Sequence, residues 1–221
     1  FTEIAIFYRT NNQSRLFEEE LRKLSLSYKV VGNVRFYDRK EIKDILAYLN
    51  YLINPEDTVS FERILNVPKR GIGESTLQKL RDYANKNEIS LSKSIENLDE
   101  INNLSDRVKK QINNFKEIIN DLKSFALQGP SETISKTLEL TGYKDELVKE
   151  GTLDSQMRLE NLDELLTSAF EFENLYEEDI EDPFTVLRDY LESIALFTDS
   201  DDVDKEDRIL LMTLHNAKGL E

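Results

Sequence analysis

Hydrophobic residues follow two patterns along the chain, and each predicts a different kind of element. Near both ends lie short apolar runs rich in β-branched and aromatic residues, which predict strands at 3–8, 28–32 and 208–215. The apolar positions of 13–24 recur at helical spacing and predict an amphipathic helix. Strand, helix and strand in succession indicate a βαβ unit whose first two strands pair in parallel.

The long middle of the chain carries almost no strand pattern, and its apolar residues recur at the helical period of about 3.6. Asp57 or Thr58 is the expected N-cap of the second helix, and the Ser/Thr pair 75–76 is the expected cap of the third. The expected helices span 39–53, 57–66, 75–86, 104–126, 131–141, 143–149, 156–173 and 184–196.

These patterns predict a mostly α protein in which a helical bundle domain is inserted into part of an α/β domain. We expect residues 1–35 and 206–221 to share one sheet layer and residues 36–205 to form the inserted bundle. The sheet is expected to be incomplete, because parallel strands need helices on both faces. The chain starts at Phe1 within a strand-like run, which we interpret as a fragment of a longer protein.

Composition and charge exclude several kinds of binding site and partner. There is no cysteine and a single histidine, His215, so disulfides, thiolate sites and multi-histidine metal sites are excluded, and no metal site is expected. No apolar run has the length of a membrane span, so we expect a cytoplasmic protein with no membrane partner. The net charge of −15 argues against nucleic-acid binding over the whole surface. Residues 1–80, however, hold 13 Lys/Arg against 11 Asp/Glu, which leaves room for a local basic contact.

The stretch 66-NVPKRGIGEST-76 is the most specific local pattern. Gly71 and Gly73 permit a backbone in which successive N–H groups point outward, and a helix is expected directly after them. Free amides at a helix N-terminus favour a phosphate, and Lys69 and Arg70 add positive charge beside them. The alternative is an ordinary corner between two helices, and this stretch alone does not decide between the two.

Five stretches together resemble the UvrD/PcrA/Rep group of superfamily 1 DNA helicases, in order and spacing over the whole chain. They are 4-IAIFYRTNNQSRLFEEEL-21, 31-VGNVRFYDRKEIKDILAYL-49, 61-FERILNVPKRGIGESTLQKL-80, 158-RLENLDEL-165 and 210-LLMTLHNAKGLE-221. The resemblance implies that 1–35 and 206–221 belong to a RecA-like motor domain, 2A, and that 36–205 is its helical insertion, 2B.

The resemblance also implies roles for single residues. Positions that match contacts to single-stranded DNA are Asn11, Arg35, Thr213 and His215. Positions that match the element gripping duplex phosphates are Lys69, Arg70, Gly71, Ile72, Gly73 and Thr76. Gly219 and Glu221 match the ATP site, where the carboxylate would bond the ribose. The chain departs from the family pattern at Asn33, where glycine is usual, and at Asn216, where a small residue is usual.

The resemblance implies a parent protein that is an ATP-dependent 3′-to-5′ DNA helicase acting in repair or replication, associated with the bacterial nucleoid. ATP and Mg²⁺ are its expected cofactors, and single-stranded DNA and the duplex junction are its expected partners, with repair or replication proteins besides. The chain contains no phosphate loop and no acidic magnesium motif, so it holds no expected catalytic residue and should be inactive alone, with no cofactor bound. Two alternatives are a protein-docking module and a subunit of a recombination nuclease-helicase.

Overall fold

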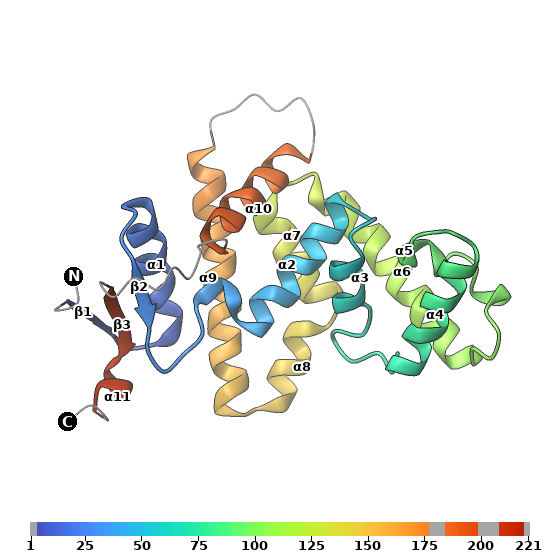
Figure 1. The fold of residues 1–221 in the computed structure, drawn as a ribbon, viewed down its shortest axis with the longest axis horizontal. Coiled ribbons are helices and arrows are strands. Elements are labelled where there is room, and N and C mark those ends of the chain that lie inside the picture. Colours follow the sequence, from blue (N-terminus) through green and yellow to red (C-terminus); the bar gives the residue numbers. More distant parts are fainter. Residues whose placement is uncertain (1–3, 177–183, 199–207, 219–221) are drawn as a thin grey trace.

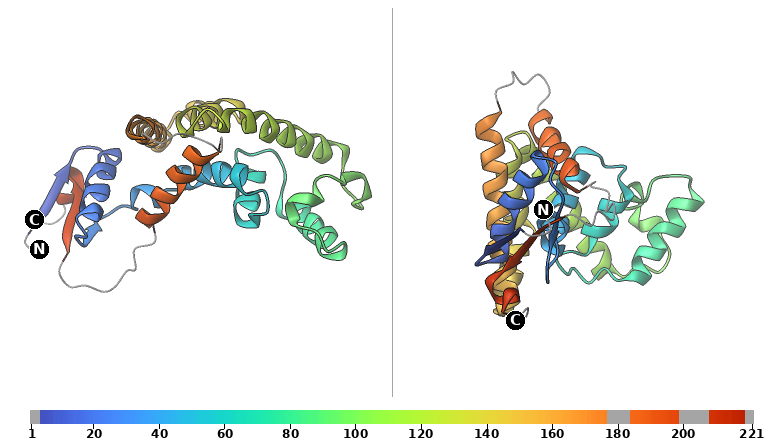
Figure 2. Two further views of the ribbon diagram at one scale, coloured as in Figure 1. Left: turned by 90° about the horizontal axis from the view of Figure 1, so that it is seen from above. Right: turned by 60° about the vertical axis from the view of Figure 1, so that its left-hand side comes forward.

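A small α/β unit and a larger helical body make up the protein in a computed structural model, which describes residues 4–176, 184–198 and 208–218. The α/β unit lies at one end and contains both the first and the last described segments (Figure 1). The helical body extends away from it as a long curved array (Figure 2). This arrangement confirms the mostly α fold with a helical region inside an α/β one. The domain boundary expected at 205–206 lies outside the described residues.

The sheet has three parallel strands in the order β1-β3-β2, formed by β1 (Ala5–Tyr8), β2 (Tyr28–Val30) and β3 (Ile209–Thr213). The predicted direct pairing of the first two strands is therefore wrong, because β3 lies between them. The register of β3 places Thr213 opposite Tyr8 of β1 and Leu211 opposite Val30 of β2. Leu211 and Met212 are almost completely buried, which explains why the most continuous apolar run occupies the centre of the sheet.

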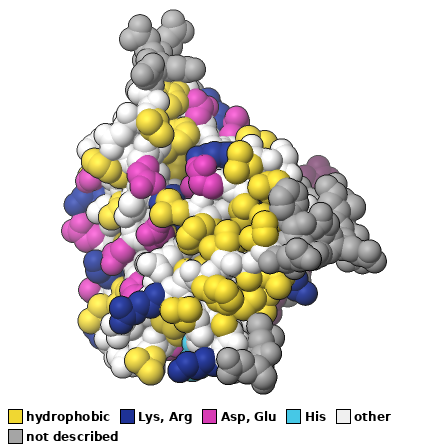
Figure 3. Space-filling model, turned by 90° about the vertical axis from the view of Figure 1, so that its left-hand side faces the viewer, with side chains coloured by type: hydrophobic (Ala, Val, Ile, Leu, Met, Phe, Trp, Pro, Cys, Tyr) yellow, Lys and Arg dark blue, Asp and Glu magenta, His cyan; other side chains and the backbone are white. Residues whose placement is uncertain are grey.

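One face of the sheet is covered by α1 (Ser14–Lys23), which follows β1 through the 3-10 turn η1 (Asn11–Gln13). Leu21 of α1 packs with Tyr8, Ile209 and Leu211 in a small core of its own. On the opposite face Phe7 is 50% exposed. Hydrophobic side chains gather on the outer surface of this end of the molecule (Figure 3). Met212, which pairs with Phe7 on that face, is 2% exposed, so the face is open only in part.

The helical body agrees closely with the expected helices. Its members are α2 (Lys40–Ile53), α3 (Thr58–Leu65), α4 (Glu74–Lys86), α5 (Leu91–Ser94), α6 (Asp106–Ala126), α7 (Pro130–Leu140), α8 (Tyr143–Glu150), α9 (Leu153–Leu175) and α10 (Thr185–Thr198), with the 3-10 turns η2 (Phe36–Asp38) and η3 (Leu98–Glu100). The short α5 and η3 are not predicted by the sequence pattern. None of the helices in the described ranges is both long enough and apolar enough to cross a membrane.

Helix caps explain where two of these helices begin. Asp57 accepts hydrogen bonds from the amides of Val59 and Ser60, both at 3.1 Å, and so caps α3 as one of the two expected candidates. The prediction of a Ser/Thr cap for α4 is wrong. Gly73 occupies the N-cap position without a side-chain bond, and α4 starts one residue earlier than expected, at Glu74.

Helix α2 is the centre of the helical core. Ile42, Ile45 and Leu49 have no exposed surface, and α2 contacts α3, α6, α7, α9 and α10. Phe61 of α3 meets Phe115 of α6 with ring centroids 6.2 Å apart, which joins the far end of the body to the centre.

A cluster of polar side chains around the buried Arg15 joins the α/β unit to the helical body. The guanidinium of Arg15 in α1, which is 2% exposed, bonds Glu164 of α9 at 2.7 Å, Glu171 of α9 at 2.9 Å and Glu19 at 3.1 Å. Burial would lower the pKa of Arg15, but these carboxylates more than reverse that effect, so its pKa is raised. The two parts of the molecule are therefore connected by paired charges as well as by the chain itself.

Candidate nucleic-acid interface

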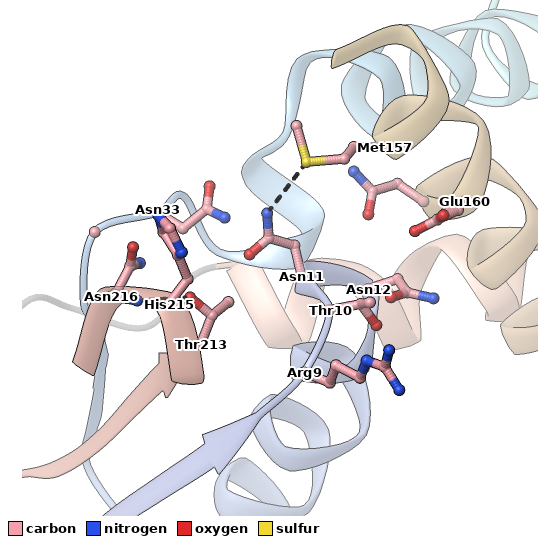
Figure 4. A pocket seen from close by; sticks show the side chains of 12 residues that line it. Arg9, Thr10, Asn11, Asn12, Asn33, Met157, Glu160, Thr213, His215 and Asn216 are labelled. Carbon is pink, nitrogen blue, oxygen red and sulfur yellow. Dashed lines mark hydrogen bonds between the residues drawn. The ribbon is translucent and has the colours of Figure 1, made fainter. Parts of the chain in front are cut away.

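The carboxyl ends of the three strands meet at one edge of the sheet, and the segments that follow them line a pocket of about 340 Å³. These segments are 9–12 after β1, 32–33 after β2 and 213–216 at the end of β3. Met157, Glu160 and Asn161 of α9 form the facing wall (Figure 4). In open parallel sheets such a crevice is the usual place for a ligand.

Three of the four residues predicted to contact single-stranded DNA line this pocket. Asn11, Thr213 and His215 come from opposite ends of the chain and are brought together by the pairing of β1 with β3. Arg35 does not line the pocket and stands before the turn η2 instead. DNA binding by all four residues stays a prediction.

The end of β3 differs from the expected strand 208–215. The strand ends at Thr213, whose hydroxyl oxygen accepts a hydrogen bond from the amide of Asn216 at 3.2 Å and caps the short helix α11 (Leu214–Ala217). His215 therefore lies in a helix and is exposed to solvent at the pocket rim. The strand thus ends at the capping residue Thr213, and His215 lines the pocket from α11.

The two departures from the family pattern lie side by side. The side-chain amide of Asn216 donates to the carbonyl of Val31 at 3.1 Å, just before Gly32 and Asn33. Gly32 has a φ of +73°, and a Cβ added to it would lie 2.5 Å from Asn216 Nδ2. This bond ties the end of β3 to the segment that leads from the sheet into the helical body.

Gly32→Ala is expected to lower the free energy of unfolding by about 1.5 kcal/mol, because a left-handed backbone strains alanine and the new methyl group meets Asn216. Gly71→Ala is the matched control, since Gly71 has a φ of +75° but no atom within 4 Å of an added Cβ. Urea unfolding followed by circular dichroism measures both. A loss no larger for Gly32→Ala than for Gly71→Ala would show that the contact with Asn216 carries no cost.

Asn11 is held in place through its backbone. Its carbonyl accepts a hydrogen bond from Arg39 Nη2 at 2.9 Å, and Arg39 also bonds the side chains of Ser14 and Asn161. The side-chain amide of Asn11 makes only a 3.9 Å contact with the sulfur of Met157. The side-chain oxygens of Asn11 and Asn12 have no hydrogen-bond partner among the described residues. The protein thus fixes the backbone of this segment and, within the described residues, leaves the side-chain oxygens of Asn11 and Asn12 without a partner.

The second predicted site, the turn 66–76, lies at the start of α4 in the helical body. Its backbone is organised by Asn66, whose side-chain oxygen accepts hydrogen bonds from the amides of Arg70 at 2.8 Å and Ile72 at 3.1 Å. Sequence reasoning does not single out Asn66. An asparagine placed before a glycine turn is the available signal, because its side chain can bond the backbone a few residues on.

Arg70 has a different place from the one expected for a phosphate ligand. Its Nη1 lies 3.0 Å from the carbonyl oxygens of Ile64 and Val67, its Nη2 donates to the hydroxyl of Tyr48 at 2.7 Å, and its guanidinium lies 5.3 Å from the Phe115 ring centroid. Arg70 therefore closes the carboxyl end of α3 and braces the turn from within.

The remaining residues of the turn divide into an inner and an outer set. Ile72 and Thr76 are buried, whereas Lys69, Gly71 and Gly73 are exposed. Within the described residues, no acceptor contacts the amides of Gly71 or Gly73. Glu74 brings a carboxylate to the same helix start, but Arg81 binds it at 2.7 Å. The outer set offers one cation and bare amides, which suits a phosphate.

The predicted ATP residues Gly219 and Glu221 lie outside the described residues. In the part of the chain that the structure describes, no group of three or more His, Asp or Glu side chains is arranged to hold a metal ion.

Comparison with known proteins gives concordant results over the whole chain. A family model described as UvrD-like helicase C-terminal domain matches residues 1–221. Proteins named ATP-dependent DNA helicase PcrA from Staphylococcus epidermidis and Staphylococcus aureus are 41% identical to this chain over 222 aligned residues. The alignments cover all of this chain but only 30% of each of those proteins.

Proposed function

Because the chain belongs to the UvrD-like helicase family, we propose that it is part of an ATP-dependent DNA helicase that moves 3′ to 5′ along one strand and acts in repair or replication. The chain spans 30% of the length of the PcrA relatives, so ATP and Mg²⁺ would be held largely by other parts of the enzyme. Glu221 and Gly219 would contribute to the ATP site from this chain. Without the phosphate loop, the isolated chain should be inactive.

The observation that carries the proposal is the convergence of distant segments on one pocket. Residues 9–12 and 213–216 are separated by the whole helical body in sequence, yet they share the pocket at the strand ends. Asn11, Thr213 and His215 supply hydrogen-bonding groups there, and Arg9 supplies a cation. Such a mixture suits the sugar–phosphate backbone of a single strand. Arg35 would contact the strand outside the pocket.

The outer set of the turn at the start of α4 is the proposed duplex contact. Lys69 and the amides of Gly71 and Gly73 would hold backbone phosphates without reading base sequence. Arg70, Ile72 and Thr76 would act indirectly, by keeping the turn in shape. In this arrangement the helical body grips the duplex, and its position relative to the motor domain would regulate unwinding.

Duplex affinity of the intact helicase is expected to fall with salt, and Lys69→Ala is expected to reduce the slope of log K against log salt by about one, since one phosphate contact is lost. Lys86→Ala is the matched control, because Lys86 is an exposed lysine at the far end of α4, whereas Lys69 lies in the turn before α4 starts. Fluorescence anisotropy with a labelled duplex over a range of salt concentrations measures both.

A slope that is the same for Lys69→Ala, Lys86→Ala and the unaltered protein would contradict the duplex contact. It would favour the alternative in which the helical body serves as a docking surface for other proteins. Loss of unwinding without any change in duplex affinity would point in the same direction.

A further inference from the structure

The pocket at the strand ends has two chemically different walls. The wall formed by the α/β unit carries Arg9, Thr213 and His215, which can donate hydrogen bonds to phosphate oxygens. The wall formed by α9 carries Met157, which is 42% exposed, and Glu160. Figure 4 shows the two walls facing each other across Asn11. A ligand that enters the pocket must therefore match a donor-rich surface on one side and an apolar, acidic surface on the other.

The α9 wall is unsuited to phosphate. The carboxylate of Glu160 has no ion-pair partner within the described residues, so it presents a negative charge that repels a phosphate. The thioether of Met157 is apolar and polarisable, and thioethers make favourable contacts with aromatic rings. A nucleobase is aromatic and carries N–H donors on its edge, which a carboxylate can accept.

The unsatisfied amides of the pocket favour the same orientation. The side-chain oxygens of Asn11 and Asn12 are hydrogen-bond acceptors without a partner among the described residues. A phosphate at neutral pH offers mainly acceptors, whereas the Watson–Crick edge of every base carries at least one N–H donor. Because the Asn11 amide is held only by its 3.9 Å contact with Met157, rotation of that amide would bring its oxygen to a base placed against the sulfur.

We propose that this pocket seats one nucleobase of the bound single strand against Met157, with the edge of the base toward Glu160 and Asn11 and the phosphates toward Thr213 and His215. The proposal rests on the proposed binding of single-stranded DNA and adds that the helical body, through α9, takes part in it. The strand is thereby oriented, with its backbone on the motor side and a base on the side of the insertion.

The test compares two labelled single strands of equal length, one of thymidine nucleotides and one with abasic sites at its centre, in anisotropy titrations with the intact helicase. Met157→Ala is expected to weaken binding of the thymidine strand about fivefold and to leave binding of the abasic strand nearly unchanged. Leu153→Ala is the matched control, since Leu153 lies on the same helix, is 82% exposed and does not line the pocket.

The outcomes separate this inference from the proposed function. If both strands bind, and Met157→Ala weakens them equally or weakens neither, the base is not seated on α9 and the inference is overturned while single-strand binding stands. If the unaltered protein binds neither strand, both proposals fall together.

Discussion

Arg70→Ala is expected to lower the free energy of unfolding by about 3 kcal/mol, although Arg70 belongs to a basic stretch that predicts a DNA contact. The guanidinium bonds the carbonyls at the end of α3 and the hydroxyl of Tyr48, and it lies over Phe115. Its removal takes a charged donor from these part-buried carbonyls and from the Tyr48 hydroxyl, and deletes a cation–π contact. Duplex binding should fall as well, because the turn loses its internal support.

Lys69→Ala is the control for this prediction, because Lys69 is exposed and no ion pair within the described residues involves it. It should change the free energy of unfolding by less than about 0.5 kcal/mol while still weakening duplex binding. Urea unfolding followed by circular dichroism and duplex titration, run on both variants, give the comparison. If Arg70→Ala kept full stability and still lost duplex binding, the guanidinium would be acting on DNA directly.

Arg15→Ala is expected to cost about 4 kcal/mol, the second large effect in the molecule. The side chain is 2% exposed and pairs with Glu19 and with Glu164, which are themselves mostly buried, and with the more exposed Glu171. Without the guanidinium, two shielded carboxylates lose their counter-charge and cannot be fully solvated in place. The loss should fall on the contact between α1 and α9, and so on the connection between the α/β unit and the helical body.

Lys23→Ala on the same helix serves as the comparison for Arg15→Ala. Lys23 is 59% exposed and pairs with Glu20 at 2.7 Å, so its removal should change stability by less than about 0.5 kcal/mol. Calorimetry of the two variants distinguishes a shielded pair from a solvent-exposed one. A cost below about 1 kcal/mol for Arg15→Ala would show that water replaces the guanidinium in this cluster, and that the α1–α9 contact does not depend on it.

Much of the fold could be predicted from the sequence because the apolar periodicity that marks a helix lies within the helical segment itself. The apolar stripe of 39–53 records which face of α2 is buried, and that information is contained in the segment itself. The same holds for the Asp57 cap and for the three strand segments. The sequence does not reveal the cap of α4, because Gly73 occupies the N-cap without a side-chain bond and the hydroxyl residues Ser75 and Thr76 lie inside the helix.

The sequence by itself determined the two kinds of element, their order, the basic glycine turn and the family. Tertiary structure alone decided that β3 separates β1 from β2, that Arg70 turns inward, that Asn216 bonds the chain beside Gly32, and that α9 completes the pocket. The physical reason is the range of the interactions. Periodicity and capping depend on residues within a few positions of one another, whereas strand order and the partner of a long side chain depend on which distant segments come to lie beside it.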